Sequence, residues 1–254
     1  MVVLAVVAIA AILGVYFALK GVAPRPSRQA ATPTSTSPVT ATSTTATASP
    51  QTLTLEEIET GLNLSQVASL GPSNASKVIV IFYDPQCPFC ALELNATLPF
   101  LYYISANTSQ ARVIFIGIPI HEDSAQMLEI LEAVYQKYGQ MAFANLLAYN
   151  YAYYVYLIDL YEQGAIPTFM MPNTTTLLLM AERLGYNVTP AEIASESGIV
   201  EDMYEFALSH GITGTPTILA YNSTGAPVYV QVGAVQPAYM IGNLTEKLGL
   251  KLPS

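Results

Sequence analysis

The stretch KVIVIFYDPQCPFC, residues 77–90, decides the fold. Its first half, residues 77–83, is apolar and β-branched, which predicts a central strand buried on both faces. Its second half places Cys87 and Cys90 where that strand gives way to a helix expected to run to about Ile104. A sulfur at a helix N-terminus meets unpaired backbone N–H groups and the positive end of the helix dipole. Both favour the thiolate, which is the species that reacts in disulfide exchange.

The two cysteines therefore predict redox chemistry. Cys87 is expected to be the exposed nucleophile, and Cys90, one helical turn further on, the shielded thiol that resolves a mixed disulfide. Pro88 suits the first helical position, which needs no N–H. The chain has no other cysteine, and a disulfide across three residues restrains the unfolded chain little. Reactivity is thus the better reason for the pair.

Half of a zinc site would have the same C-x-x-C pattern. Zinc usually takes four protein or water ligands, but the chain offers no second pair and only two histidines, His121 and His210. We therefore expect no metal and no cofactor besides a redox-active disulfide, Cys87–Cys90. For His121 we expect a capping or core position, with a role as proton carrier as the alternative.

Strand and helix signals continue outward from this stretch. Thr54 and Glu57 form a capping box that opens a short helix. Residues 112–118 (RVIFIGI) predict a second buried strand, and residues 123–210 are mostly helical, with breaks near 139, 164–172 and 185–190. Strands at 217–221 and 228–232 and a helix at 237–248 follow. This order predicts an α/β domain with a central mixed sheet, flanking helices and a helical insert.

The run Gly214-Thr215-Pro216-Thr217 begins one of these strands. A proline at the start of a strand, after Thr215, is a candidate for a cis peptide bond. The alternative is an ordinary trans proline at a strand edge. Its occurrence together with the C-x-x-C pair and the strand–strand–helix ending favours cis.

Together these features resemble the thioredoxin superfamily, and most of all the DsbA-like disulfide oxidoreductases of the cell envelope. The resemblance covers roughly residues 70–248. It rests on VIVIFYDPQCPFC (78–90), IPIH (118–121), the helical insert, GITGTPTILAY (211–221) and the closing helix. It implies a thioredoxin-like fold and an enzyme that forms, reduces or isomerises protein disulfides through Cys87 and Cys90. It also implies a substrate groove, with backbone pairing to the bound peptide, lined by Pro88, Phe89, Thr215 and Pro216.

Two departures from that family bear on mechanism. Many relatives carry a buried acid six residues before the nucleophile, where this chain has Ile81; Asp84, Glu93 or water would have to replace it. Strongly oxidising relatives have Pro-His between the cysteines, whereas Phe89 supplies no charge to hold a thiolate. The context DPxCPxC also resembles the catalytic domains of envelope disulfide isomerases and reductases. The direction of electron flow therefore stays open, and an oxidase or isomerase is slightly favoured.

The first 52 residues differ in composition from the rest. Residues 2–19 are an unbroken apolar run, long enough as a helix to span a bilayer. We expect a membrane anchor at residues 1–20, since Pro24 disfavours cleavage after Ala23; a cleaved signal segment is the alternative. Residues 21–52 predict an extended linker, because 14 of residues 27–52 are Ser or Thr. The globular domain is then residues 53–254, with the insert at 122–210.

The asparagines predict an extracytoplasmic domain. Eight of ten lie in N-x-[ST] sequons, and glycans are attached outside the cytoplasm. Asn187 is the weakest because Pro190 follows its Thr189. The basic residues after the apolar run, among them Lys20 and Arg25, instead favour a cytoplasmic domain, so a cytosolic redox protein is the alternative. The glycosylation candidates are Asn63, Asn74, Asn95, Asn107, Asn173, Asn222 and Asn243.

Charge narrows the range of partners. From residue 51 onward the chain carries six Lys and Arg against 18 Asp and Glu, a formal charge of −12. Such a surface repels phosphate backbones, which argues against nucleic acid. We expect unfolded or cysteine-containing proteins as substrates, a membrane redox partner, and attachment to the membrane through the N-terminal helix. The alternative functions are a thioredoxin-like Cu(I) metallochaperone and a non-catalytic peptide-binding module.

Tyrosines are concentrated in residues 141–161. Their number and the length of the run would suit a second membrane span, but Asn145, Asn150 and Asp159 argue against one. We expect a helix that faces the core with tyrosine hydroxyls at its rim. The alternative is an aromatic cap over the cysteines that binds unfolded peptide.

Overall fold

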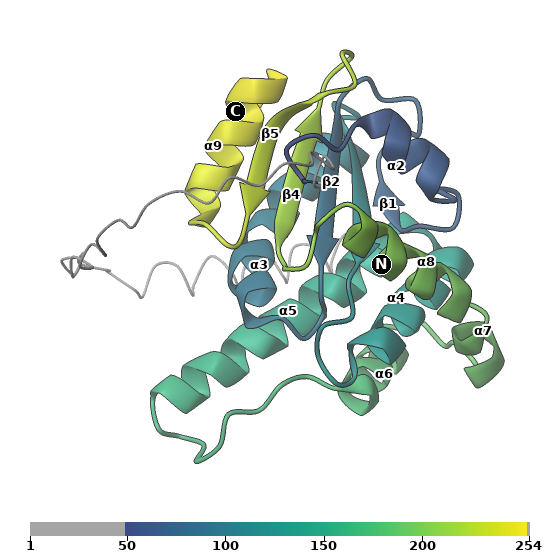
Figure 1. Ribbon diagram of the computed structural model, residues 1–254. Helices are drawn as coiled ribbons and strands as arrows, with labels where there is room; N and C mark the ends of the chain where they lie inside the picture. Colours follow the sequence, from purple (N-terminus) through teal and green to yellow (C-terminus); the bar gives the residue numbers. More distant parts are fainter. Residues whose placement is uncertain (1–48, 253–254) are drawn as a thin grey trace, which may run out of the picture. The chain divides into compact units, whose positions relative to one another are not determined.

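The computed structural model describes residues 49–252 (Figure 1). The predicted anchor at residues 1–20 and all but the last four residues of the predicted linker at 21–52 lie outside the described residues. Both therefore stay predictions.

Five strands form one mixed sheet in the order β1-β3-β2-β4-β5. The central strand β2 (Val78–Tyr83) is parallel to β3 (Arg112–Gly117) and antiparallel to β4 (Thr217–Tyr221). The edges are β5 (Pro227–Val232), beside β4, and the two-residue β1 (Ser69–Leu70), beside β3. Every residue of β2 is buried, as its continuous apolar sequence predicts. The prediction of a central mixed sheet is confirmed.

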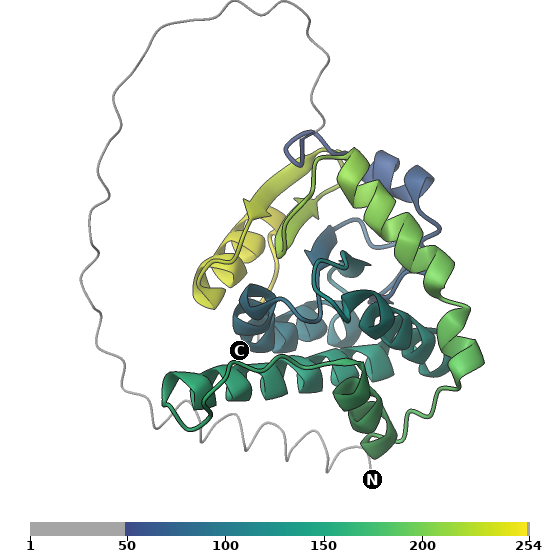
Figure 2. The same cartoon turned by 60° about the horizontal axis from the view of Figure 1, so that its bottom comes forward.

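Helices cover both faces of this sheet (Figures 1 and 2). On one face α3 (Pro88–Tyr102), which continues into the π-helical turn η1 (Tyr103–Asn107), packs against α9 (Pro237–Leu248). On the other face α2 (Leu55–Gly61) begins with the predicted capping box and ends against α8 (Ser197–Ser209). A Cβ at Gly61 would lie 2.5 Å from the Phe206 ring of α8, so glycine permits this close approach.

The helical insert occupies the predicted place between β3 and β4. It comprises α8 together with α4 (Ser124–Tyr138), α5 (Gln140–Glu162), α6 (Thr174–Arg183) and α7 (Pro190–Ala194). The longest, α5, packs along α3 and α4, and its distal end projects beyond them (Figure 1). Across residues 49–252 no helix, α5 included, combines the length and apolar character needed to cross a membrane.

The chain joins the domain at the end of the sheet that lies away from the cysteines. The Tyr221 hydroxyl donates to the Leu53 carbonyl at 3.0 Å, and the Leu55 N–H donates to the Gly225 carbonyl at 2.9 Å. Tyr221 pairs with Val78, the first residue of β2, whereas Cys87 follows the last. About 17–20 Å of strand therefore separates the two ends.

Candidate functional site

Both cysteines sit at the head of α3, as predicted. Cys87 is the N-cap residue with extended backbone angles, and Pro88 occupies the first helical position. The Cys87 N–H donates to the Asp84 carbonyl at 3.1 Å, and the Cys87 carbonyl accepts from the Ala91 N–H at 3.0 Å. This turn sets the nucleophile candidate at the positive end of the helix.

The proline loop lies beside the sulfur. The Thr215–Pro216 bond is cis, and the Cys87 Sγ–H donates to the Thr215 carbonyl at 3.4 Å across 128 residues of sequence. Pro216 is held in turn by the Gly233 N–H, which donates to its carbonyl at 2.9 Å. The predictions of a cis bond and of its proximity to the cysteines are confirmed.

The two thiols are free and differ in acidity. The pKa of Cys87 is lowered to about 6, above all by a hydrogen bond from the Cys90 side chain; burial opposes this, and the Thr215 side chain and the first helical N–H groups add to it. The pKa of Cys90 is raised well above its usual value, mainly by burial. The predicted division of roles therefore has a physical basis, with Cys87 more readily ionised than Cys90.

One prediction about Cys87 is wrong. It was expected to be exposed, but only 3 % of its surface is accessible, against 0 % for Cys90. The Thr215 carbonyl, 3.4 Å from the sulfur, is one of the groups that cover it. The next residues are more accessible, since Phe89 is 60 % exposed and Pro88 is half-buried.

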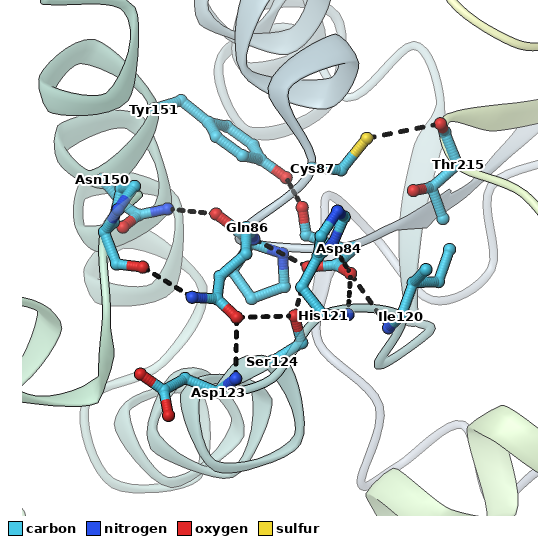
Figure 3. A network of polar contacts seen from close by, with 12 residues as sticks. Asp84, Gln86, Cys87, Ile120, His121, Asp123, Ser124, Asn150, Tyr151 and Thr215 are labelled. Atoms are coloured by element: carbon cyan, nitrogen blue, oxygen red, sulfur yellow. Dashed lines mark hydrogen bonds and ion pairs between the residues drawn. The ribbon is translucent and has the colours of Figure 1, made fainter. Parts of the chain in front are cut away.

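A buried polar cluster centred on Asp84 supports the loop before Cys87 (Figure 3). One carboxylate oxygen of Asp84, Oδ1, accepts from the Gln86 N–H at 2.7 Å and the Ser124 hydroxyl at 2.6 Å. The other, Oδ2, accepts from the N–H groups of Ile120 and His121 at 3.0 and 3.2 Å and contacts His121 Nδ1 at 2.8 Å. Asp84 thus binds β2 to the start of the insert.

Helix α5 holds the same loop from another side. The Tyr151 hydroxyl donates to the Asp84 carbonyl at 3.0 Å, and Asn150 Nδ2 donates to the Pro85 carbonyl at 2.9 Å (Figure 3). Tyr151 and Tyr154 are fully buried, whereas Tyr149, Tyr156 and Tyr161 are exposed. The prediction of a core-facing helix is confirmed, but the hydroxyls of Tyr151 and Tyr154 are buried and do not reach the rim as expected.

Neither Asp84 nor Glu93 is hydrogen-bonded to Cys90 through its carboxylate. Glu93 is buried, accepts both carboxylate hydrogen bonds from Gln231 Nε2 at 2.7 and 3.0 Å, and also accepts from the Val235 N–H. Burial raises the pKa of Glu93. Ile81 is buried within β2. His121 is half-buried and its ring contacts Asp84; the N-cap of α4 is Asp123, so the His121 side chain does not cap that helix.

The glycosylation candidates fall into two groups. Five lie in turns or at element ends: Asn63, Asn74, Asn107, Asn173 and Asn222. Asn95 and Asn243 lie within α3 and α9 and are half-buried. The sequon of Asn95 includes Thr97, whose buried hydroxyl donates to the Glu93 carbonyl. An acceptor at Asn95 is therefore hard to reach once the chain has folded.

Two features were not predicted. These are the roles of Gln86 and Asn150. Both side chains bind main-chain groups far away in the sequence, and only the position of Gln86 inside the DPQCPFC run could have singled it out.

In the part of the chain from residue 49 to 252, no group of three or more His, Cys, Asp or Glu side chains is placed to hold a metal ion.

Comparison with known proteins agrees with this architecture. Residues 66–247 match the family model of the thioredoxin-like domain. No curated protein sequence is detectably similar to the chain.

Solved structures share the fold at low sequence identity. The catalytic domain of ScsC from Proteus mirabilis is 19 % identical, with a TM-score of 0.55 over 76 % of this chain and 96 % of that one. The thiol-disulfide exchange protein α-DsbA2 from Wolbachia pipientis is 14 % identical, with 0.55 over 76 % and 92 %. BdbD from Bacillus subtilis is 15 % identical, with 0.54 over 74 % and 96 %. Since the family model covers most of its length, the chain belongs to the thioredoxin-like domain family.

Proposed function

We propose that this protein is a DsbA-like thiol–disulfide oxidoreductase that acts on cysteine-containing polypeptides. One observation carries the proposal. The Cys87 sulfur, at the head of α3, lies 3.4 Å from the carbonyl oxygen of Thr215, the residue before cis-Pro216. A sulfur in that position meets the backbone that would hold a bound peptide.

The exchange runs through a mixed disulfide. In the oxidising direction a substrate thiolate attacks Cys87 of the Cys87–Cys90 disulfide, and Cys90 leaves as a thiolate that takes up a proton. A second substrate thiolate then attacks the substrate sulfur of the mixed disulfide, and Cys87 leaves. The substrate gains a disulfide and the enzyme pair is reduced by two electrons. The reverse sequence reduces a substrate disulfide.

Peptide binding is assigned to the residues around the sulfur. The main chain of Thr215 would pair with an extended segment of substrate by strand addition, with Pro216 shaping the loop. Phe89, 60 % exposed, and the adjoining Pro88 would supply an apolar surface next to Cys87. Each of these four residues is assigned to peptide binding because it lies close to the Cys87 sulfur.

Oxidation or isomerisation is the favoured direction. A pKa of Cys87 near 6 stabilises the reduced pair relative to the disulfide, and a stabilised reduced form makes the disulfide a better electron acceptor. A redox titration measures this directly. A potential well above roughly −200 mV would support oxidation, and one near roughly −270 mV would support reduction.

The decisive experiment uses reduced and scrambled ribonuclease as substrates. Cys87→Ser is expected to abolish refolding activity, because no sulfur remains to form the mixed disulfide. Cys90→Ser is expected to accumulate mixed disulfides visible on non-reducing gels. Full activity in both variants would refute the proposal.

The domain is proposed to work outside the cytoplasm, tethered by residues 1–20 and reoxidised or reduced by a membrane partner. The five sequons in turns or at element ends support this placement, because such positions present the asparagine outside the regular helices and strands. Mass spectrometry of protein from the native source should find glycans at these positions ahead of Asn95 and Asn243. Unmodified asparagines throughout would favour the cytosolic alternative.

A further inference from the structure

The side chain of Gln86, the residue before Cys87, reaches two separate parts of the insert. It is 3 % exposed. Its Nε2 donates to the Pro172 carbonyl at 2.7 Å. Its Oε1 accepts from the Asp123 N–H at 2.8 Å and from the Ser124 hydroxyl at 3.2 Å (Figure 3). One amide thus fastens the nucleophile loop both to the start of α4 and to the residue just ahead of the α6 cap.

Pro172 ends a segment with an unusual surface. Residues 164–172, GAIPTFMMP, contain no charged side chain, although the domain as a whole is strongly acidic. Phe169, Met170 and Met171 are 38, 52 and 38 % exposed. Consecutive large apolar side chains at a surface are characteristic of contact sites, and methionine adapts to partners of varied shape.

This segment, residues 164–172, runs back along α5 to the start of α6 (Figure 1). The Phe169 ring lies 6.1 Å from the ring of Tyr154 and 5.5 Å from that of Tyr161. Tyr154 is one turn beyond Asn150 and Tyr151, which bind the loop before Cys87. Ring contacts therefore hold the middle of the segment, and Gln86 holds the end nearest the nucleophile.

We infer that Gln86 is a positioning residue that keeps residues 164–172 in register with Cys87 as one wall of the polypeptide site. The inference rests on the proposed function. The occupant is an extended polypeptide with apolar side chains near its reacting cysteine, because the segment is apolar, uncharged and joined to the sulfur loop by one side chain. A basic peptide would find no carboxylate on these nine residues.

A comparison of a long and a short substrate tests this inference. Glutathione can react at Cys87 but has no apolar side chain to place against Met170, whereas a peptide with apolar residues on both sides of its cysteine does. We compare second-order rate constants for the two substrates. Gln86→Met has nearly the same shape but loses every side-chain hydrogen bond. The ratio of the peptide rate to the glutathione rate should fall about tenfold, the effect of losing one well-placed hydrogen bond.

The matched control is Ser124→Ala, which removes the two hydrogen bonds of that hydroxyl at the α4 end, to Asp84 Oδ1 and Gln86 Oε1, and leaves the bond from Gln86 to Pro172. It should change both rates by the same factor, so that their ratio stays at the wild-type value. An unchanged ratio in Gln86→Met, or an equal fall in Ser124→Ala, would overturn the inference. A wild-type protein inactive on both substrates would instead refute the proposed function.

A second variant keeps the test valid if Gln86→Met does not fold. Met170→Ser changes only an exposed side chain, and it should lower the peptide-to-glutathione ratio several-fold. Leu208→Ser removes a similarly exposed apolar side chain from α8 (43 % exposed) and should leave the ratio unchanged. Equal ratios in these two variants would show that residues 164–172 do not contact the peptide.

Discussion

The sheet with α3 and the helical insert contribute different things to one site. The sheet side supplies the reacting groups, Cys87 and Cys90 at the head of α3 and the cis-proline loop at the start of β4. The insert supplies no cysteine. Its side chains, among them Ser124 and Tyr151, hold the loop on which Cys87 stands. Chemistry and positioning are therefore encoded in separate parts of the chain and can be disturbed separately.

The largest expected effect comes from removing the Asp84 carboxylate, which joins the sheet to the helical insert. Asp84→Ala would remove the acceptor of three N–H groups and of the Ser124 hydroxyl, together with the contact to His121 Nδ1, at a fully buried position. We expect the free energy of unfolding to fall by about 3–5 kcal/mol, measured by denaturant titration. Asp202→Ala, on the exposed face of α8, should change it by no more than about 0.5 kcal/mol. A loss below about 1 kcal/mol at Asp84 would mean that the cluster does not join sheet and insert.

A milder change removes only one hydrogen bond between the insert and the loop before Cys87. Tyr151→Phe keeps the buried ring and removes the hydroxyl that donates to the Asp84 carbonyl. The expected loss is about 1 kcal/mol of unfolding free energy, with Tyr156→Phe, 57 % exposed on the same helix, as the neutral control. Equal stability of the two variants would contradict a supporting role for Tyr151.

On the sheet side, the thiols of Cys87 and Cys90 are expected to ionise, and so to react, in different pH ranges. The rate of Cys87 alkylation by iodoacetamide is expected to rise with a midpoint near pH 6, the pKa of that thiol, while Cys90 stays unreactive because burial raises its pKa. Peptide mapping after brief alkylation distinguishes the two positions. A midpoint near the ordinary thiol value of about 8.5 would remove the basis for assigning Cys87 as nucleophile.

The same ionisation has a consequence for stability. Cys87 has a lower pKa in the folded reduced protein than in the unfolded chain, so its contribution is full above the unfolded value and is lost as pH falls toward 6. The melting temperature of the reduced protein minus that of Cys87→Ser should therefore increase between pH 6 and 9. A difference that is flat across this range would argue against a stabilised thiolate.

The smallest expected effect concerns the residue between the cysteines. Phe89→His would add a cation, when protonated, near the Cys87 sulfur, at a position that is 60 % exposed. Solvent screening should limit the further fall in the pKa of Cys87 to about one unit, read from thiolate absorbance. Phe89→Gln serves as the uncharged control, and a shift of equal size in both variants would exclude a charge effect.

The same two parts differ in how far the sequence predicts them. Local runs and repeats of apolar residues in the sequence predicted the strands β2, β3 and β4 and the helix α9. The two-residue β1 was not, since Ser69 and Leu70 are too few to show alternation. At the site, the motif predicts Cys87, Cys90 and Pro216, whereas the covering of Cys87 depends on a loop 128 residues away. Asn150 and Gln86 bind main-chain carbonyls, which carry no residue-specific signal.

The attachment of residues 53–55 to the β4–β5 hairpin also bears on how large substrates reach the enzyme. The hydrogen bonds from Tyr221 to Leu53 and from Leu55 to Gly225 fix the incoming chain at the far end of the sheet. Residues 53–55 therefore lie at the opposite end of the strands from Cys87 and do not compete with a bulky, partly folded client docking there.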